Sequence, residues 1–213
     1  MEGVEVVGLG RARRREAARV LTDAFLHDPA WVAIGPPSER ARRRLLRRFF
    51  GVALFEARHW GGPAWAATRG RAMLGVAVTF GAGEAFPSPW ASLLEAPLFL
   101  LAGRQTSQHA VQVGAAMARA HPRRPHLYLW FLAAHPGHQR RGVGRALMRR
   151  VLDEATDRGV PVYLETASPE NLPYYRSFGF EVTGEAALPG TSRMWFMYRP
   201  MPEDAPRAAG LRE

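Results

Sequence analysis

The sequence has no cysteine and no lysine, and each absence excludes a class of chemistry. Without cysteine, the 213-residue chain forms no disulfide, no thiolate metal site and no cysteinyl acyl-enzyme. Without lysine, it lacks the residue that forms a Schiff base and the one that completes a phosphate-binding P-loop. All 29 basic residues are therefore arginines, and with 19 acidic residues they give a formal net charge of +10.

Long apolar runs are missing as well. A stretch such as residues 98–102 is far shorter than the roughly 20 apolar residues that span a bilayer. The acidic start of the chain has no apolar signal region after it. We therefore expect a cytoplasmic protein with no membrane partner. Its 47% hydrophobic content predicts a single domain over residues 1–200, followed by a frayed tail over 201–213.

The positive charge includes a dense arginine cluster between residues 40 and 48. Charge of this size can serve nucleic-acid binding, but runs of charge more often mark solvated helix faces. A small ligand with several phosphate charges would explain the same composition. The motifs described below favour that ligand, so nucleic acid is the disfavoured partner.

Hydrophobic spacing in the first half predicts both helices and strands. A helix that begins after Ser38 is expected to bury Phe49 and Phe50 and to turn the arginine cluster outward. In chain order we expect a strand at 4–9, a helix that ends near 27–29, the helix from 38, strands at 63–69 and 71–80, a loop at 81–89, and two helices within 90–120 that meet near Gly103.

The second half predicts a unit of strand, helix and parallel strand. Residues 127–134 form one continuous apolar run, which is typical of a strand buried on both faces. We expect a glycine-rich loop at 135–144, a helix from about 143 to 158, a strand at 162–166, a short helix that ends by Gly179, and a hairpin that turns at Pro189 and Gly190. The fold class is therefore α/β, with a mixed central sheet flanked by helices.

The loop before the helix at 143–158 has the composition of a phosphate site. Backbone N–H groups at a helix N-terminus have no partner within the helix, and the helix dipole adds positive charge. Glycines let a ligand approach the backbone, and neighbouring arginines can add charge-assisted bonds. The loop reads Gln139-Arg140-Arg141-Gly142-Val143-Gly144. It is not a P-loop, and Leu147 stands where a dinucleotide motif has its third glycine. A simple turn with solvated arginines is the alternative.

A second motif follows 27 positions after Gly144. Asn171, the only asparagine in the sequence, precedes Tyr174-Tyr175-Arg176-Ser177-Phe178-Gly179-Phe180. Together the two segments resemble the GNAT (GCN5-related) N-acetyltransferases, whose acyl-CoA loop reads Q/R-x-x-G-x-G/A and is followed by an N…Y…GF segment. Residues 136–139, 164–175 and 195–197 look similar to the subgroup that includes puromycin N-acetyltransferase. The resemblance covers about residues 127–200, and nothing specific is found between residues 35 and 120.

The resemblance implies the GNAT acyl-CoA N-acyltransferase fold, with acetyl-CoA as cosubstrate and no metal. It places main-chain groups of the strand before the loop against the cosubstrate, where backbone donors can stabilise an oxyanion. The implied cofactor-binding residues are Leu132, Ala133, Ala134, Gln139, Arg140, Arg141, Gly142, Val143, Gly144, Arg145, Asn171 and Tyr175.

The resemblance also implies the catalytic residues. Its tyrosine position falls on Tyr175, which we expect to be the general acid, and Tyr174 is then the structural aromatic. The strand at 127–134 carries no acid, so Glu165 on the next strand is the nearest candidate for the general base. The alternative for Glu165 is a structural ion pair with an arginine, and His135 before Pro136 is more typical of a turn. A water chain or an already neutral amine would need no base.

These residues predict an acetyl-CoA-dependent N-acetyltransferase. Because no cysteine can carry the acyl group, we expect a small-molecule amine to attack directly within a ternary complex. The subgroup points to antibiotic-like or xenobiotic-like amines, while peptide N-termini, polyamines, longer acyl groups and a homodimer stay open. The alternative is a GNAT-fold regulatory module that binds a CoA ester or nucleic acid without turnover. The presence of Tyr175 and Asn171 argues against that alternative.

Overall fold

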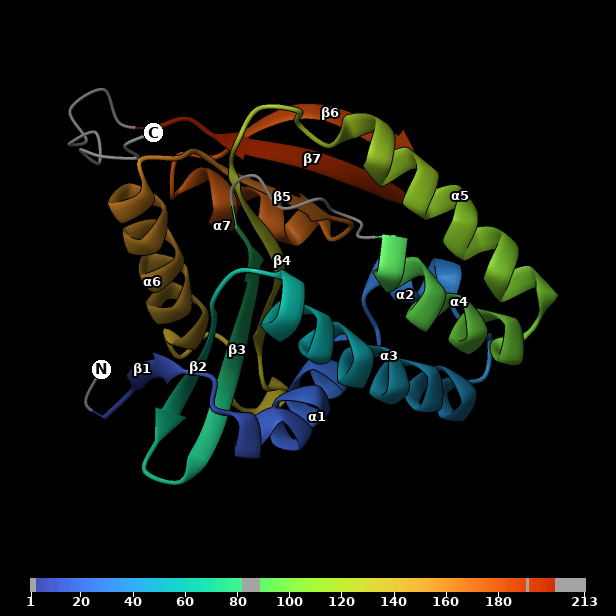
Figure 1. Ribbon diagram of the computed structural model, residues 1–213, viewed down its shortest axis with the longest axis horizontal. Helices are drawn as coiled ribbons and strands as arrows, with labels where there is room; N and C mark the ends of the chain where they lie inside the picture. Colours follow the sequence, from blue (N-terminus) through green and yellow to red (C-terminus); the bar gives the residue numbers. More distant parts are fainter. Residues whose placement is uncertain (1–2, 82–88, 191, 202–213) are drawn as a thin grey trace.

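The computed structural model describes residues 3–81, 89–190 and 192–201, and Figure 1 shows its arrangement. Its centre is a seven-stranded sheet in the order β1-β2-β3-β4-β5-β7-β6. The strands are β1 (Glu5–Gly8), β2 (Ala64–Arg69), β3 (Ala72–Phe80), β4 (Leu127–Ala134), β5 (Val162–Thr166), β6 (Glu181–Ala187) and β7 (Arg193–Arg199). β4 and β5 run parallel and the other neighbouring pairs run antiparallel, so the predicted mixed sheet with a central βαβ unit is confirmed.

Helices cover both faces of the sheet. They are α1 (Arg14–Phe25), α2 (Pro29–Ile34), α3 (Glu39–Trp60), α4 (Pro89–Ala102), α5 (Arg104–Ala120), α6 (Val143–Arg158) and α7 (Leu172–Arg176). Short 3-10 turns lie at η1 (Arg11–Arg13), η2 (Pro136–His138) and η3 (Pro169–Asn171). In Figure 1, α1 and α3 lie apart from α6, with the sheet between them. Within the described ranges, no helix is both long enough and apolar enough to cross a membrane.

Most predicted elements are present. The helical region at 90–120 does divide at Gly103, whose φ of 119° is one that a side chain rarely adopts. α2 was not predicted, because six residues give too little periodicity. Pro89 already belongs to α4, so the predicted loop is shorter than 81–89. Its residues 82–88, and residues 202–213 of the predicted tail, lie outside the described residues.

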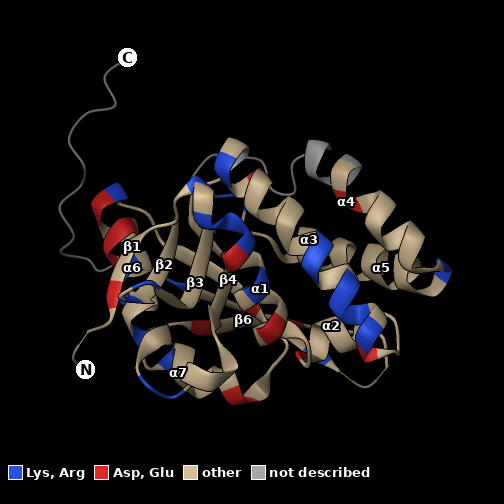
Figure 2. Ribbon diagram, turned by 90° about the horizontal axis from the view of Figure 1, so that it is seen from below, with Lys and Arg blue, Asp and Glu red and all other residues tan. Residues whose placement is uncertain are grey.

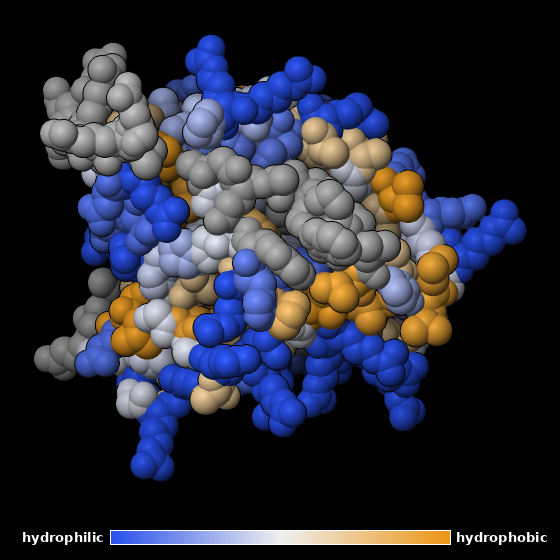
Figure 3. Space-filling view, in the orientation of Figure 1, coloured by the Kyte–Doolittle hydropathy of each residue, from blue (hydrophilic) through white to orange (hydrophobic). Residues whose placement is uncertain are grey.

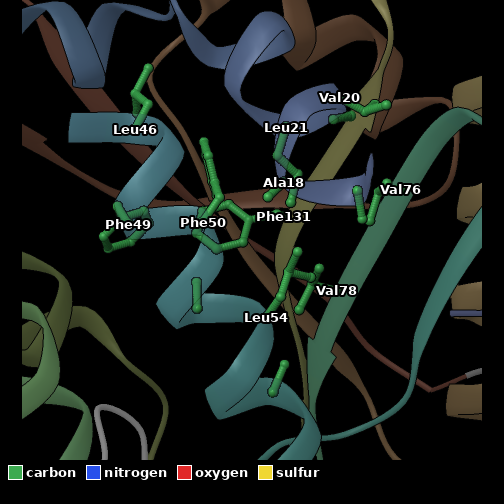
Figure 4. Packing of buried hydrophobic residues seen from close by; sticks show 14 of the residues in the cluster. Ala18, Val20, Leu21, Leu46, Phe49, Phe50, Leu54, Val76, Val78 and Phe131 are labelled. Atoms are coloured by element: carbon green, nitrogen blue, oxygen red, sulfur yellow. The ribbon is translucent and has the colours of Figure 1, made fainter. Parts of the chain in front are cut away.

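The core on one side of the sheet is largely aromatic. Phe50 on α3 contacts Phe131 on β4 edge to face, with ring centroids 5.1 Å apart. Figure 4 shows this pair between Leu21 of α1 and Val78 of β3. The opposite side is formed mainly by aliphatic residues of α6 and the strands beneath it. Burial of both faces explains why β4 reads as one continuous apolar run.

The arginine cluster on α3 is only partly exposed. Figure 2 shows basic residues along this helix, as predicted. Arg42, however, is 6% exposed, and its guanidinium donates to the carbonyls of Leu26 (2.9 Å) and Pro36 (3.1 Å). The prediction that the whole cluster faces solvent is therefore wrong for Arg42. This residue precedes Leu45 and Leu46 by one helical turn, so it shares their inward face, and its charge is tolerated there because carbonyls accept its protons.

The outer surface mixes polar and apolar side chains. Figure 3 shows hydrophilic side chains around most of one face, with smaller hydrophobic areas between them. Leu100 and Leu101 at the end of α4 are among the exposed apolar residues. On α6, Arg150 and Glu154 form an ion pair at 3.0 Å.

A β-bulge at Trp130 changes the phase of β4. Val78 of β3 pairs with Phe131, but the next residue, Thr79, pairs with Leu129, so Trp130 is the extra residue. Before the bulge, Leu129 packs on the α6 side of the sheet; after it, Phe131 packs on the α1 and α3 side. The bulge therefore redirects the last residues of β4.

The sheet opens between β4 and β5 beyond this bulge. The two strands pair only where Leu127, Tyr128 and Leu129 meet Val162, Tyr163 and Leu164. The later residues of β4 pair with β3, while Glu165 and Thr166 pair with β7. The carboxyl ends of the two parallel strands thus diverge, and such a position in an α/β sheet is where ligands commonly bind.

Candidate active site

The loop that leads from β4 into α6 exposes the N-terminus of that helix. Gly142 is the N-cap residue with φ 83°, and Arg140 has φ 58°, the only positive value of a non-glycine residue in the described ranges. Among described side chains, none caps the helix. The first N–H groups of α6 are therefore available to an anion. Left-handed geometry at Gly142 costs little because glycine has no Cβ.

The residues of this loop fit a diphosphate. Arg140, Arg141 and Arg145 are all exposed, so their charges can reach a ligand at the helix N-terminus. The Tyr174 hydroxyl is buried and has no hydrogen-bond partner in the described part of the chain. A Cβ on Gly144 would lie 3.3 Å from this hydroxyl, so the unpartnered group sits at the first turn of α6. Exposed Gln139 extends its amide to the Ala134 carbonyl at 3.5 Å.

Close packing of α6 on the sheet holds the loop in place. A Cβ on Gly75 of β3 would lie 2.6 Å from the Ala133 carbonyl oxygen and 2.7 Å from Cγ1 of Val143. Both distances are shorter than atoms tolerate, so only glycine allows the start of α6 to pack here. Leu132, Ala133 and Ala134 lie on the diverging part of β4, where the edge that faces β5 has no partner strand within the described residues.

A cavity of about 240 Å³ lies beside this opening. Of the predicted site residues, Leu132, Glu165, Asn171 and Tyr175 line it, while Ala133, Ala134 and residues 139–145 do not. The structure therefore separates the predicted residues into a loop at α6 and a cavity wall. The aromatic part of the lining consists of Phe25, Trp31, Phe49, Phe99, His121, Tyr128, Trp130, Phe131 and Tyr175.

The two adjacent tyrosines of α7 have different surroundings. Tyr175 lines the cavity and is 8% exposed, whereas the ring of Tyr174 packs against Phe178 with centroids 5.1 Å apart. Burial raises the pKa of Tyr175, and the neighbouring charges of Tyr174 and Asp28 raise it further. Tyr175 is thus a protonated phenol at neutral pH. Burial also raises the pKa of Tyr174, to about 12.

Glu165 is held by a tyrosine. The Tyr128 hydroxyl donates to its Oε2 at 2.6 Å, while its Oε1 is buried without a hydrogen-bond partner in the described ranges. Burial raises the pKa of Glu165 to about 7, although the bond from Tyr128 lowers it. Among described residues no arginine pairs with this carboxylate, so the ion-pair alternative is wrong there. His121 packs 5.0 Å from the Tyr128 ring, and burial lowers the pKa of His121 to about 4.

The structure also places His135 and Asp28, of which the sequence predicted only the first. His135 is a turn residue, as expected, because its Nδ1 accepts the Gly137 N–H at 3.2 Å. Asp28 was missed: it caps α2 by accepting the N–H groups of Ala30 (2.9 Å) and Trp31 (3.4 Å), and it lines the cavity. Burial raises the pKa of Asp28 to about 6, although these bonds lower it.

The sequence also missed Glu95, which lines the cavity from α4. Burial raises the pKa of Glu95 to about 8, and the charge of Glu56 on α3 contributes. A signal was available, because Glu95 is the single charged residue between residues 90 and 102. A charged residue within an apolar helix is unfavourable unless its side chain reaches a polar environment or a ligand, and Glu95 faces the cavity.

The comparisons with known proteins agree with this geometry. Residues 80–180 match the model of the acetyltransferase (GNAT) family. The match covers just under half of the chain, and the fold of the whole chain agrees with the GNAT family. Members of this family use acetyl-CoA or another acyl-CoA. The GNAT assignment agrees with the observed sheet and with the loop at the start of α6.

Individual relatives match different shares of the chain. It is 40% identical over 60 residues to the L-amino acid N-acyltransferase MnaT of Escherichia coli (strain K12), a match that covers 27% of the chain and 35% of that relative. The chain thus matches about a third of the length of this curated protein.

Two solved structures share the fold. One is described as histone acetyltransferase HPA2 and related acetyltransferase from Corynebacterium glutamicum, with a TM-score of 0.68 and 24% identity over 94% of this chain and 99% of the other. The other is an agmatine N-acetyltransferase variant in its apo form, with a TM-score of 0.64 and 15% identity over 94% and 100%. The predicted GNAT fold is confirmed.

Proposed function

We propose that this GNAT protein is an acetyl-CoA-dependent N-acetyltransferase that acylates a small-molecule amine. The observation that carries the proposal is that Glu165, Asn171 and Tyr175 line one cavity, which lies at the divergence of β4 and β5. A cavity of about 240 Å³ with mostly aromatic and aliphatic walls suits a small molecule. The names of MnaT and of the agmatine enzyme support an amine as acceptor. The resemblance to the puromycin subgroup supports an antibiotic-like amine.

The loop and the open strand edge would hold acetyl-CoA. The first N–H groups of α6, together with Arg140, Arg141 and Arg145, would bind the diphosphate. The rest of the acetyl-CoA molecule would contact main-chain groups of Leu132, Ala133 and Ala134 and the side chain of Asn171. When bound, acetyl-CoA supplies a thioester as the acyl donor. The protein would position the two substrates and provide the side chains that transfer protons.

Glu165 is the proposed general base. With a pKa of about 7, raised by burial, its carboxylate can accept a proton near neutral pH. The hydrogen bond from Tyr128 fixes one carboxylate oxygen and leaves Oε1 for this purpose. The amine nitrogen then forms the amide bond with the acyl carbon while the C–S bond breaks, and the nitrogen proton passes to Glu165.

Tyr175 is the proposed general acid. Burial keeps its phenol protonated, so its hydroxyl can give a proton to the leaving sulfur. A thiol has an ordinary pKa near ~8.5, which makes it a fair leaving group. The proton lost by the amine and the proton gained by the thiol therefore balance, and the chain itself forms no covalent bond to the acyl group.

Release of free thiol tests the proposal. The protein is incubated with acetyl-CoA and a panel of small amines, amino acids and peptide N-termini, and the acylated product is identified by mass spectrometry. Thiol release that requires an added small amine is the expected result. Binding of CoA without release for any amine, together with salt-sensitive DNA binding, would support the regulatory alternative instead.

A further inference from the structure

One glutamate that the proposed reaction does not use lines the cavity, and a second glutamate lies behind it. Glu95 lines the cavity from α4, and Glu56 on α3 lies near it, with an exposed fraction of 1%. Figure 1 shows α3 and α4 next to each other along one side of the molecule. The negative charge of Glu56 raises the pKa of Glu95, after burial, so the two carboxyl groups are close enough to interact.

Three of the four oxygens of these carboxyl groups are buried without a hydrogen-bond partner in the described part of the chain. Both carboxylate oxygens of Glu56 and Oε1 of Glu95 are buried and accept no hydrogen bond from any described residue. By contrast, the described ion pairs lie at partly or fully exposed side chains, such as Arg193 with Glu185. A buried carboxylate is costly unless a donor or a positive charge compensates it. The pair therefore provides a place that a cation from outside the chain would complete.

Aromatic rings also line the cavity from α3 and α4, the helices that carry Glu56 and Glu95. Phe49 on α3 lies 6.0 Å from Phe99 on α4 and 6.2 Å from Trp130 on β4, measured between ring centroids. All three rings line the cavity. Such faces attract an ammonium group and also accept an apolar carbon skeleton.

Tyr128 interacts with both Glu95 and the proposed base, Glu165. Its hydroxyl donates to Glu165, and burial raises the pKa of Tyr128, which the charges of Glu165 and Glu95 raise further. Glu95 and Glu165 thus both act on one tyrosine of the cavity wall. A ligand with one nitrogen at Glu165 can extend across the aromatic rings and place a second charge at Glu95.

We propose that the acceptor is a diamine with a short apolar or aromatic body, whose distal ammonium binds Glu95. A bound ammonium favours the ionised form of both carboxyl groups, so Glu56 then adds negative charge behind Glu95 and is a positioning residue. A monoamine of the same shape fills the cavity but leaves the carboxyl pair without a cation. This inference rests on the proposed N-acetyltransferase function and specifies its substrate class.

The experiment compares two amines of matched shape, para-xylylenediamine and para-methylbenzylamine. Calorimetry measures the binding of each amine, and thiol release from acetyl-CoA gives kcat and KM. We expect the diamine to bind about tenfold or more tightly and to have a correspondingly lower KM, which exceeds the twofold statistical advantage of its equivalent amino groups.

Two variants test whether Glu95 and Glu56 cause the preference for the diamine over the monoamine. Glu95→Gln keeps the shape of the side chain and removes its charge, so it should abolish the preference for the diamine by raising the KM of the diamine far more than that of the monoamine. Glu56→Gln should reduce the preference in part. Glu185→Gln removes a surface carboxylate paired with Arg193 and should change neither KM, while a thermal unfolding curve of each variant verifies folding.

The outcomes separate this inference from the proposed function. Equal binding of the two amines by the unmodified protein overturns the diamine proposal, even where both are acylated. A Glu95→Gln variant that retains the preference, or that weakens both amines alike, also overturns it. Tight binding of the diamine without thiol release supports the cation site and contradicts the N-acetyltransferase function.

Discussion

Tyr174 and Tyr175 are adjacent in the sequence, yet their side chains point into different surroundings. Successive residues of a helix point about 100° apart, so two neighbours cannot share one environment. Tyr175 lines the cavity, whereas the Tyr174 hydroxyl lies near Gly144. The sequence motif predicted which tyrosine serves the site, and the placement agrees with that prediction. Its catalytic role stays a proposal.

Removing the hydroxyl of Tyr175 should slow the chemical step. We expect Tyr175→Phe to lower kcat by about 10²- to 10⁴-fold, because that is the usual contribution of a general acid. The KM for acetyl-CoA should change little, since the ring remains. Steady-state thiol release measures both quantities. Tyr174→Phe is the matched control, and its kcat should be nearly that of the unmodified protein; a fully active Tyr175→Phe variant would remove Tyr175 from the mechanism.

The state of Glu165 should be visible in the pH profile. Burial raises the pKa of Glu165 to about 7, and Tyr128 and Tyr163 are the groups that face it. A base acts only when deprotonated, so kcat/KM should fall more steeply with decreasing pH below about 7 than above it. Glu165→Gln should lower kcat/KM and remove this change of slope. A profile with the same break in the variant would show that another group accepts the proton.

At the scale of single elements, the start of α6 is the feature that the sequence predicted best. Its position between residues 142 and 143 and its glycine-rich approach follow from local patterns, and the helix begins at Val143 as expected. The bulge at Trp130 was not predicted, although β4 has the predicted bounds. A continuous apolar run has no alternation, so a one-residue change of register leaves no trace in it.

The helix start offers a test of cosubstrate binding. Gly142→Asp should weaken CoA binding about a hundredfold or more, because a carboxylate would occupy the place of the phosphates. Calorimetry with CoA measures the affinity. Gly10→Asp introduces the same charge at a position with no atom within 4 Å of the added Cβ, and it should leave the affinity unchanged. Normal affinity in Gly142→Asp would mean that the loop does not hold the diphosphate.

At the scale of the whole molecule, the sequence predicted the proposed acyl-donor region better than the proposed acceptor cavity. Motifs of short range identify the region from Leu127 onward. The cavity wall brings together α2, α3, α4 and α5, whose contributions include Asp28, Phe49 and Glu95. These contacts join residues far apart in the chain, and each helix alone shows only an apolar face. No local pattern states which faces enclose a cavity.

Global stability should decrease as the pH rises through neutrality. Burial raises the pKa of Glu56 from its ordinary 4.5 to about 7, so the folded protein retains a proton that the unfolded chain has already lost. The unfolded state then binds fewer protons, and the free energy of unfolding falls with increasing pH. We expect Glu56→Gln to remove roughly 2 kcal/mol of this decrease between about pH 5 and pH 8.

Urea unfolding at the two pH values measures this effect. Glu185→Gln, at an exposed position, should show the same decrease as the unmodified protein. An unchanged pH dependence in Glu56→Gln would mean that Glu56 is ionised in the folded state.

The cavity and the loop at α6 come largely from different parts of the chain, and this separation affects how the acceptor can change in evolution. The cavity draws most of its lining from residues 25–121, while the loop that we propose to bind acetyl-CoA lies within residues 139–145. Under the proposed function, exchanges on α3, α4 or α5 would therefore alter which amine is selected without changing this loop. Proteins that descend from one ancestor would in this way acquire new acceptors through substitutions in these helices alone.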